Sequence, residues 1–162
     1  MPFLVRWPAR IAPGTKSDAI GLNIDFAPTF LDVAGLPPSA DMQGRSLLAA
    51  LRRRTPSDWR TSMYYRYYHD PGDHNTRAHY GVRTRTHKLI YFWKKDQWEL
   101  FDLVNDPREL HNLYGEIGQE TLTLTLKNEL ATLKKQARDD DQLAGEQLPN
   151  GVDGPVAKLR GK

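Results

Sequence analysis

The stretch LIYFWKKDQWELFDL, residues 89–103, decides the fold. It begins with an unbroken apolar and aromatic run at residues 89–93, which is typical of a buried strand. Residues 98–103 alternate with a period of two, the pattern of a strand with one face buried. Four polar residues, 94–97, separate the two runs and have the composition of a tight connection. This stretch therefore predicts a β-hairpin.

Further elements are predicted on both sides of the hairpin. Residues 63–68 are rich in aromatics and residues 80–83 alternate weakly, so both are expected to be strands. Downstream, apolar side chains recur with the spacing of one helical stripe: Leu122, Leu126, Leu130, Leu133 and Ala137. Residues 121–126 also alternate like a strand, but the longer helical period outweighs this. We predict an α+β fold, in which a small antiparallel sheet of about four strands packs on a C-terminal helix.

Shorter elements are expected in the first fifty residues. Residues 3–7 are predicted to form a short buried strand that ends at Pro8. Residues 25–34 are predicted to form a helix, with Asp25 as its cap, Pro28 in its first turn and Gly35 after its end. Residues 46–51 and 106–109 are each expected to form a helical turn. We divide the chain into residues 1–50, 51–138 and a disordered, Gly-, Pro- and charge-rich tail at 139–162.

Composition excludes several classes of protein. The chain has no cysteine, which excludes disulfides, thiolate metal sites and cysteine nucleophiles. No stretch approaches the ~20 apolar residues that span a bilayer, so no membrane partner is expected. Residues 52–95 hold eleven Lys and Arg against three Asp, an excess of eight positive charges that favours an anionic partner.

Several segments together resemble the sulfatases of the alkaline phosphatase superfamily. Residues 23–35, NIDFAPTFLDVAG, look like the family's D-x-x-P-T-x-L-x-x-A-G helix, and QGRSL at 43–47 looks like its G-x-S-L step. Residues 80–90, YGVRTRTHKLI, resemble a strand pair of the C-terminal subdomain. Residues 98–113, WELFDLVNDPRELHNL, resemble the E-L-Y-D-L-x-x-D-P-x-E-x-x-N-L signature, with Phe101 in place of the usual tyrosine. Residues 63–93 look most similar to sulfatases that act on glycans, such as N-acetylglucosamine-6-sulfatases.

This resemblance implies a C-terminal fragment of a sulfuric ester hydrolase that acts on sulfated glycans. In the family, a Cys or Ser in a C/S-x-P/A-x-R motif becomes formylglycine, and calcium neutralises the sulfate. Both belong to the family's N-terminal portion, and none of the five serines here begins that motif. We therefore expect no catalytic residue and no metal site in this chain, with residues 1–50 as the orphaned edge of the α/β catalytic domain. For the complete enzyme we expect calcium, formylglycine, a sulfated carbohydrate, the N-terminal sulfatase domain as partner, and a periplasmic or extracellular location.

The resemblance also implies candidate substrate-binding residues. The segment around residues 70–78 looks like one that folds over the pocket rim in glycan sulfatases. His79, His74 and Arg83 are therefore expected to contact the sugar. A solvated loop is the alternative for the histidines, and a solvated strand face is the alternative for Arg83.

Three other functions stay open at this point. Zinc could be held by His69, Asp73, His74 and His79, although the spacing matches no compact zinc motif. Basic residues interleaved with aromatics also describe single-stranded nucleic-acid binders, but no RNP1-like run is present, which makes nucleic acid an unfavoured partner. A purely structural α+β module is the last alternative.

Overall fold

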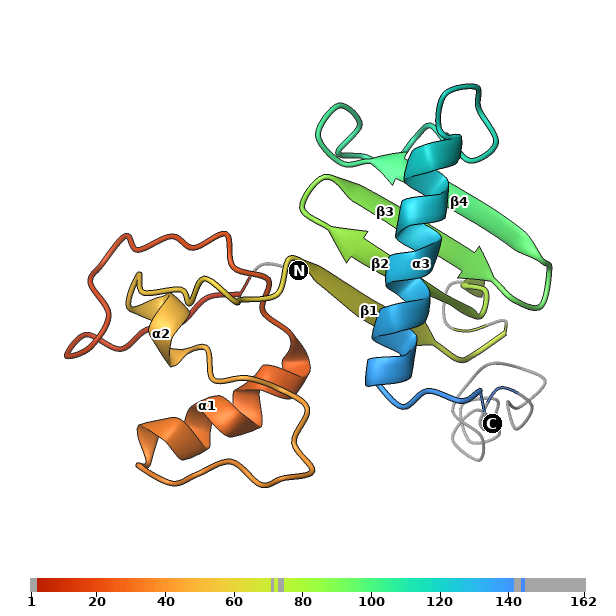
Figure 1. The fold of residues 1–162 in the computed structure, drawn as a ribbon. Helices are drawn as coiled ribbons and strands as arrows, with labels where there is room; N and C mark the ends of the chain where they lie inside the picture. Colours follow the sequence, from red (N-terminus) through yellow and green to blue (C-terminus); the bar gives the residue numbers. More distant parts are fainter. Residues whose placement is uncertain (1–2, 71, 73–74, 142–143, 145–162) are drawn as a thin grey trace, which may run out of the picture. The chain divides into compact units, whose positions relative to one another are not determined.

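The computed structural model describes residues 3–70, 72, 75–141 and 144. The chain forms two compact units that divide between Thr61 and Ser62 (Figure 1). Each unit has its own secondary structure and its own hydrogen bonds.

The second unit contains a four-stranded antiparallel sheet in which the strands follow chain order. The strands are β1 (Ser62–Tyr67), β2 (His79–Thr84), β3 (His87–Phe92) and β4 (Gln97–Asp102). The four strands predicted for the sheet are confirmed, and the predicted hairpin joins β3 to β4, with its connection at residues 93–96 where 94–97 was expected. Each strand pairs with its sequence neighbour, so local connections alone generate the sheet.

One helix, α3 (Glu120–Gln136), lies across one face of this sheet (Figure 1). The register places Val82 opposite Leu89 and Leu89 opposite Leu100, and all three are fully buried. Leu126 and Leu130 of α3 pack on this row and complete the core. Burying each such side chain contributes about 1.5–3 kcal/mol, which accounts for the pairing of sheet and helix. The predicted α+β fold and the helical stripe are confirmed.

Ion pairs tie the end of α3 to the first strand. The side chain of Arg66, on β1, is only 4% exposed, and its guanidinium group donates to both carboxylate oxygens of Asp139 at 2.7 Å. The rings of Tyr68, Tyr80 and Trp93 lie 4.5–5.2 Å from the Arg66 guanidinium carbon. Burial alone would raise the pKa of Asp139, but the bonds from Arg66 outweigh it and the pKa is lowered. Of the predicted disordered tail, only residues 139–141 and 144 lie within the described residues.

The first unit is built around Asp25. Its short elements are η1 (Asn23–Asp25), α1 (Phe26–Val33) and α2 (Leu48–Leu51), which confirm the predicted helix and the helical turn near residue 48. The carboxylate of Asp25 has no exposed surface and accepts the backbone N–H groups of Leu22 and Arg45, each at 2.8 Å. Both terminal nitrogens of Arg60 also donate to it. Asp25 is the N-cap residue of α1, as predicted, but its side chain makes no cap bond to that helix and instead accepts from Leu22, Arg45 and Arg60.

The two segments that resemble family motifs, residues 23–35 and 43–47, are joined to each other by hydrogen bonds. The hydroxyl of Thr29 donates to the carbonyl of Asp25 at 2.6 Å and accepts the N–H of Leu47 at 2.8 Å. The hydroxyl of Ser46 donates to Asp32. Gly44 lies directly against the carbonyl of Ile24, where a Cβ atom would collide with backbone. These residues are therefore structural in this chain.

Two predictions of short elements are wrong. Residues 3–7 form no strand, and Leu4 is 91% exposed, because no strand among the described residues pairs with them. Residues 106–109 form a turn and no helix. Glu109 has a φ of +57°, which leaves the helical region, and the carboxylate of Asp106 accepts the N–H groups of Leu110 and His111 beyond it.

Candidate functional site

Two of the predicted site residues, His79 and Arg83, lie on the face of the sheet turned away from α3, here called the distal face. Alternate residues of a strand share a face, so His79, Gly81 and Arg83 of β2 lie on it. The register places Tyr67 beside His79 and Tyr65 beside Gly81. The distal face thus brings aromatic, imidazole and guanidinium groups onto one surface.

His79 is held by aromatic rings from both neighbouring strands. Its ring stacks on Tyr67 at 5.7 Å, meets Tyr65 edge-on at 5.8 Å and lies 5.4 Å from Phe92. Its Nδ1 lies 2.7 Å from the carbonyl oxygen of Arg77. Because a carbonyl only accepts, Nδ1 carries the hydrogen, and Nε2 of the neutral ring is an acceptor. Among the described residues none hydrogen-bonds Nε2, so that atom is available to a ligand hydroxyl.

Tyr65 adds a buried polar group next to His79. Its hydroxyl has no hydrogen-bond partner in the described part of the chain. A Cβ atom at Gly81 would lie 2.7 Å from that hydroxyl and would also meet the carbonyl of Leu89, so only glycine fits there. Burial raises the pKa of Tyr65, which keeps the phenol neutral and able to donate. Unpaired buried hydroxyls are uncommon in native proteins and call for a specific explanation.

Part of the loop between β1 and β2 packs against the aromatic cluster around His79. Arg77 pairs with Asp70 at 3.3 Å, and the N–H of Gly72 donates to the carbonyl of Thr76 at 2.7 Å. Gly72 is buried against the Tyr67 ring, with no room for a side chain. The predicted site residue His74, like Asp73, lies outside the described residues.

Arg83 lies on the distal face but not in the His79 cluster. It is exposed, and it lies four positions along the strand from His79, a distance of about 13 Å. Lys88 lies opposite Arg83 on β3 and pairs with Glu109 at 2.5 Å. A ligand that reached both His79 and Arg83 would have to be larger than one sugar ring.

The residues that the structure describes do not fit the family's metal, and the sequence does not contain the family's nucleophile motif. Across residues 3–70, 72, 75–141 and 144, no three His, Cys, Asp or Glu side chains gather as metal ligands. The chain has no cysteine, and none of its five serines begins the motif from which formylglycine forms. The zinc hypothesis rests on four residues, of which Asp73 and His74 are not described, and it stays untested. No helix in the described part of the chain is long and apolar enough to cross a bilayer.

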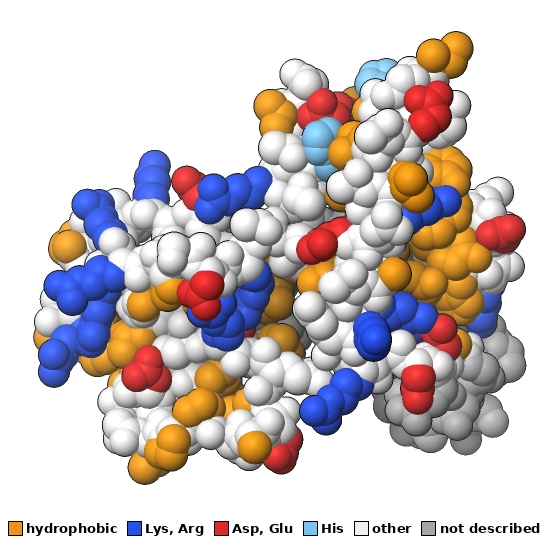
Figure 2. Space-filling view, in the orientation of Figure 1, with side chains coloured by type: hydrophobic (Ala, Val, Ile, Leu, Met, Phe, Trp, Pro, Cys, Tyr) orange, Lys and Arg blue, Asp and Glu red, His pale blue; other side chains and the backbone are white. Residues whose placement is uncertain are grey.

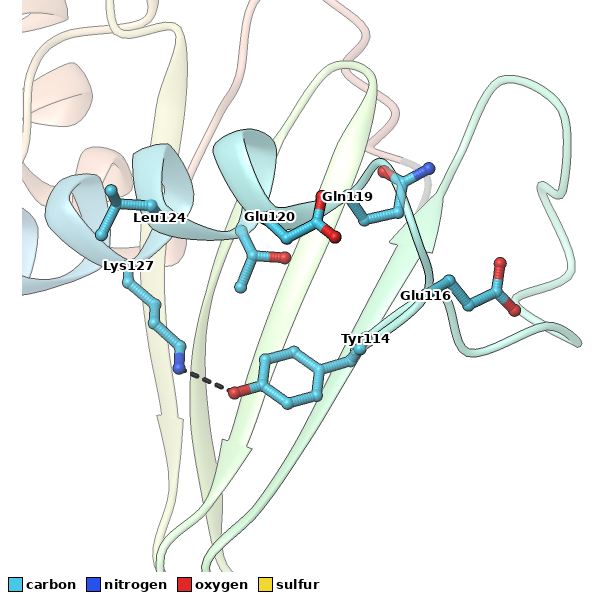
Figure 3. Close-up of a pocket in the computed structure, with 8 residues that line it drawn as sticks. Tyr114, Glu116, Gln119, Glu120, Leu124 and Lys127 are labelled. Atoms are coloured by element: carbon cyan, nitrogen blue, oxygen red, sulfur yellow. Dashed lines mark hydrogen bonds between the residues drawn. The ribbon is translucent and has the colours of Figure 1, made fainter.

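A separate hollow lies where α3 begins, lined by Tyr114, Glu116, Gln119, Glu120, Leu124 and Lys127 among others (Figure 3). The amine of Lys127 donates to the hydroxyl of Tyr114 at 2.8 Å and lies 4.2 Å from the centre of the Trp98 ring. The positive charge of Lys127 thus interacts with aromatic rings. Glu116 and Glu120 make the hollow acidic. This hollow does not suit a sulfate group, and its aromatic and amine contacts join α3 to β4.

The sequence led to the prediction of His79 as a site residue but did not single out its neighbours. Tyr65, Tyr67 and Phe92 were expected only as sheet packing. The period of two along β1 could have placed Tyr65 and Tyr67 on one face, but the β1–β2 register that sets Tyr67 beside His79 requires the structure.

Comparison with known proteins gives consistent matches to sulfatases. The family model for the C-terminal region of N-sulphoglucosamine sulphohydrolase matches residues 1–136. An N-acetylglucosamine-6-O-sulfatase of Bacteroides thetaiotaomicron is 43% identical over 144 residues, covering 87% of this chain and 26% of the relative. A sulfatase of Formosa agariphila is 31% identical, covering 78% of this chain and 25% of the relative. The chain therefore spans about a quarter of the length of these relatives.

Solved structures agree with the sequence matches. The structure of BT4656 in complex with its substrate, D-glucosamine-2-N,6-O-disulfate, is similar with a TM-score of 0.79 and 43% identity, over 84% of this chain and 28% of that one. BT1596, a 2-O GAG sulfatase, shares the fold, with a TM-score of 0.62 over 72% of this chain and 25% of that one. These matches favour the sulfatase interpretation over the nucleic-acid and purely structural alternatives. This chain belongs to the sulfatase family, as a C-terminal domain of the N-sulphoglucosamine sulphohydrolase type.

Proposed function

We propose that this domain selects the sugar in a complete sulfatase that hydrolyses sulfate esters of glucosamine-containing glycans. The observation that carries the proposal is His79, whose Nδ1 is anchored on a carbonyl while Nε2 has no partner among the described residues. A relative at 43% identity is an N-acetylglucosamine-6-O-sulfatase, which supports the choice of sugar.

The distal face has the groups that sugar recognition requires. Nε2 of His79 can accept a sugar hydroxyl, whereas the unpaired phenol of Tyr65 is buried and belongs to the ring cluster that supports His79. The rings that pack on His79 fix its orientation, so little conformational entropy is lost when a sugar binds. Arg83, about 13 Å away, suits a charged group on a neighbouring sugar of the same chain. We propose the same binding role for His74, on the resemblance alone.

The catalytic portion of the complete enzyme is the partner that we propose for the first unit. Phe26, Phe30 and Val33 project from α1 with 39%, 71% and 46% of their surface exposed, and the Phe3 ring lies 5.2 Å from that of Phe26. An apolar face of this kind marks an interaction site. In that assembly calcium would polarise the sulfate and formylglycine would supply the nucleophile, both from residues outside this chain.

The test is His79→Ala in the complete enzyme. Loss of one buried hydrogen-bond partner costs about 1–3 kcal/mol, so kcat/KM on a sulfated glucosamine should fall by roughly ten- to a hundredfold. Activity on a small aryl sulfate, which offers no sugar hydroxyl, should be nearly unchanged. His87→Ala is the matched control, because His87 is a histidine of the same sheet on the α3 face. Equal losses on both substrates would show that His79 serves the catalytic centre or the fold.

A further inference from the structure

The first unit has a hollow of about 360 Å³ that is surrounded by arginine side chains. Its lining combines four cations with aliphatic and small residues: Arg10, Ile11, Ala12, Thr15, Leu51, Arg52, Arg53 and Arg54. No carboxylate lines it. In Figure 2, Lys and Arg side chains gather along the outer edge of the first unit.

These four arginines are not engaged in holding the fold together. All four are exposed, and none forms an ion pair with a carboxylate within the described residues. By contrast, Arg45 and Arg60 of the same unit both bond carboxylates. Four like charges around one hollow repel one another unless an anion lies among them.

Arg53 has a left-handed backbone conformation at the end of α2. Arg53 follows α2 with a φ of +59°, and the N–H groups of Arg53 and Arg54 bond the carbonyls of Ala50 and Ala49. This is the Schellman arrangement, in which the left-handed position is usually glycine because a side chain there is disfavoured. The chain instead has arginine at this position, and it lines the hollow. Arg138 ends α3 in the same arrangement with a φ of +56°, so the backbone alone does not mark a site; Arg53 is distinguished because it also lines the hollow.

We propose that this arginine hollow binds the sulfated glycan chain outside the catalytic centre, as a docking site for the polymer. The assignment to a sulfated glycan rests on the proposed function. The lining itself disfavours single-stranded nucleic acid, because no aromatic ring is present on which a base could stack. Guanidinium groups bind sulfate oxygens in pairs of parallel hydrogen bonds, which suits a chain bearing several sulfates.

The experiment measures binding of a heparin-type sulfated hexasaccharide to the full 162-residue chain, by calorimetry at several salt concentrations. Affinity should fall as salt rises. The double variant Arg52→Gln/Arg54→Gln should bind about tenfold more weakly near 0.1 M salt, and Arg53→Gly about threefold more weakly. Arg53→Gly is the decisive variant, since it should bind more weakly while the first unit is as stable as before or more so.

Lys94→Gln/Lys95→Gln is the matched control, because both lysines are exposed cations in the β3–β4 hairpin of the second unit. It should change affinity less than twofold. Equal losses in the control and in Arg52→Gln/Arg54→Gln would overturn the proposal, because the attraction would then follow net charge alone. It would also be overturned if an oligonucleotide bound as tightly through the same arginines, or if Arg53→Gly bound the hexasaccharide unchanged. This experiment measures binding and not turnover, so it can fail or succeed independently of the proposed function. If binding depends on the arginines but the complete enzyme does not hydrolyse sulfated glucosamine, only the proposed function is refuted.

Discussion

Asp25→Asn removes the charge at the centre of the first unit while leaving the shape of the side chain almost unchanged. In the native protein, four donors converge on the Asp25 carboxylate: two backbone N–H groups and both terminal nitrogens of Arg60. An asparagine amide can accept at its oxygen only, and its NH₂ group faces donors. The guanidinium of Arg60, whose side chain is 15% exposed, loses its counter-charge.

The expected cost follows from this burial. Removing one partner of a buried ion pair costs about 3–5 kcal/mol, since an uncompensated charge stays behind. Asp58→Asn is the matched control: Asp58 pairs with Arg45 at 3.0 Å, but its side chain is 75% exposed. An exposed pair of this kind contributes about 0–1 kcal/mol. The two substitutions should therefore differ by several kcal/mol although the chemical change is the same.

The pH dependence has a defined sign. Burial alone would raise the pKa of Asp25, but the hydrogen bonds from Arg60, Arg45 and Leu22 outweigh it and hold the pKa below its ordinary value of 3.8. A lowered pKa gives stability that is present above about pH 4 and is lost as pH falls through the folded-state value. The stability of the first unit should therefore be similar in the native chain and in Asp25→Asn in strong acid, and higher in the native chain at neutral pH.

Hydrogen exchange read by mass spectrometry is the appropriate assay, because it reports on the two units separately. In Asp25→Asn, exchange should speed up across residues 22–61, while residues 62–102 stay protected as in the native chain. Asp58→Asn should leave both regions unchanged. Equal exchange in the two variants would refute the argument that Asp25 and Arg60 hold the first unit together.

Three further outcomes are expected. Gly44→Ala should destabilise the first unit by about 1–3 kcal/mol, because the added methyl group meets the carbonyl of Ile24, and unchanged exchange there would contradict this. Asp139→Asn should lower the free energy of unfolding of the second unit in urea by about 2–3 kcal/mol, since Arg66 is buried and, among the described residues, keeps Asp141 alone as an ionic partner. An unchanged urea midpoint would show that the pair is dispensable. The chain by itself should hydrolyse neither aryl sulfates nor sulfated sugars, with or without calcium, and activity that survives repeated purification would contradict this.

Local patterns in the sequence were sufficient for the elements of the second unit. The predicted strands fall within two residues of β1 to β4 at each end, and the leucine stripe falls within α3 apart from Ala137. These elements were predictable because each depends on the period of its own apolar residues and each strand pairs with its sequence neighbour. The strand predicted at residues 3–7 does not form, because apolar character favours a strand but a strand also needs a partner strand to pair with.

The candidate site was only partly predictable. The resemblance gave His79 and Arg83, but it did not indicate that one is held in a ring cluster and the other lies about 13 Å away in solvent. The distance between His79 and Arg83 follows from the rise per residue of a strand, so it could be calculated only once both residues were known to lie in one strand.

By itself, the sequence determined the family and the order of the elements in the second unit, because motif order and apolar period are properties of the chain. Only the tertiary structure decided what the motif residues do. Asp25 has the position of a helix cap but is neutralised by Arg60, thirty-five residues later. Arg66 looks like a surface cation of an aromatic strand but is buried against Asp139, seventy-three residues later. Local pattern cannot encode such pairs, because the energy of a buried charge depends on which partner the fold brings beside it.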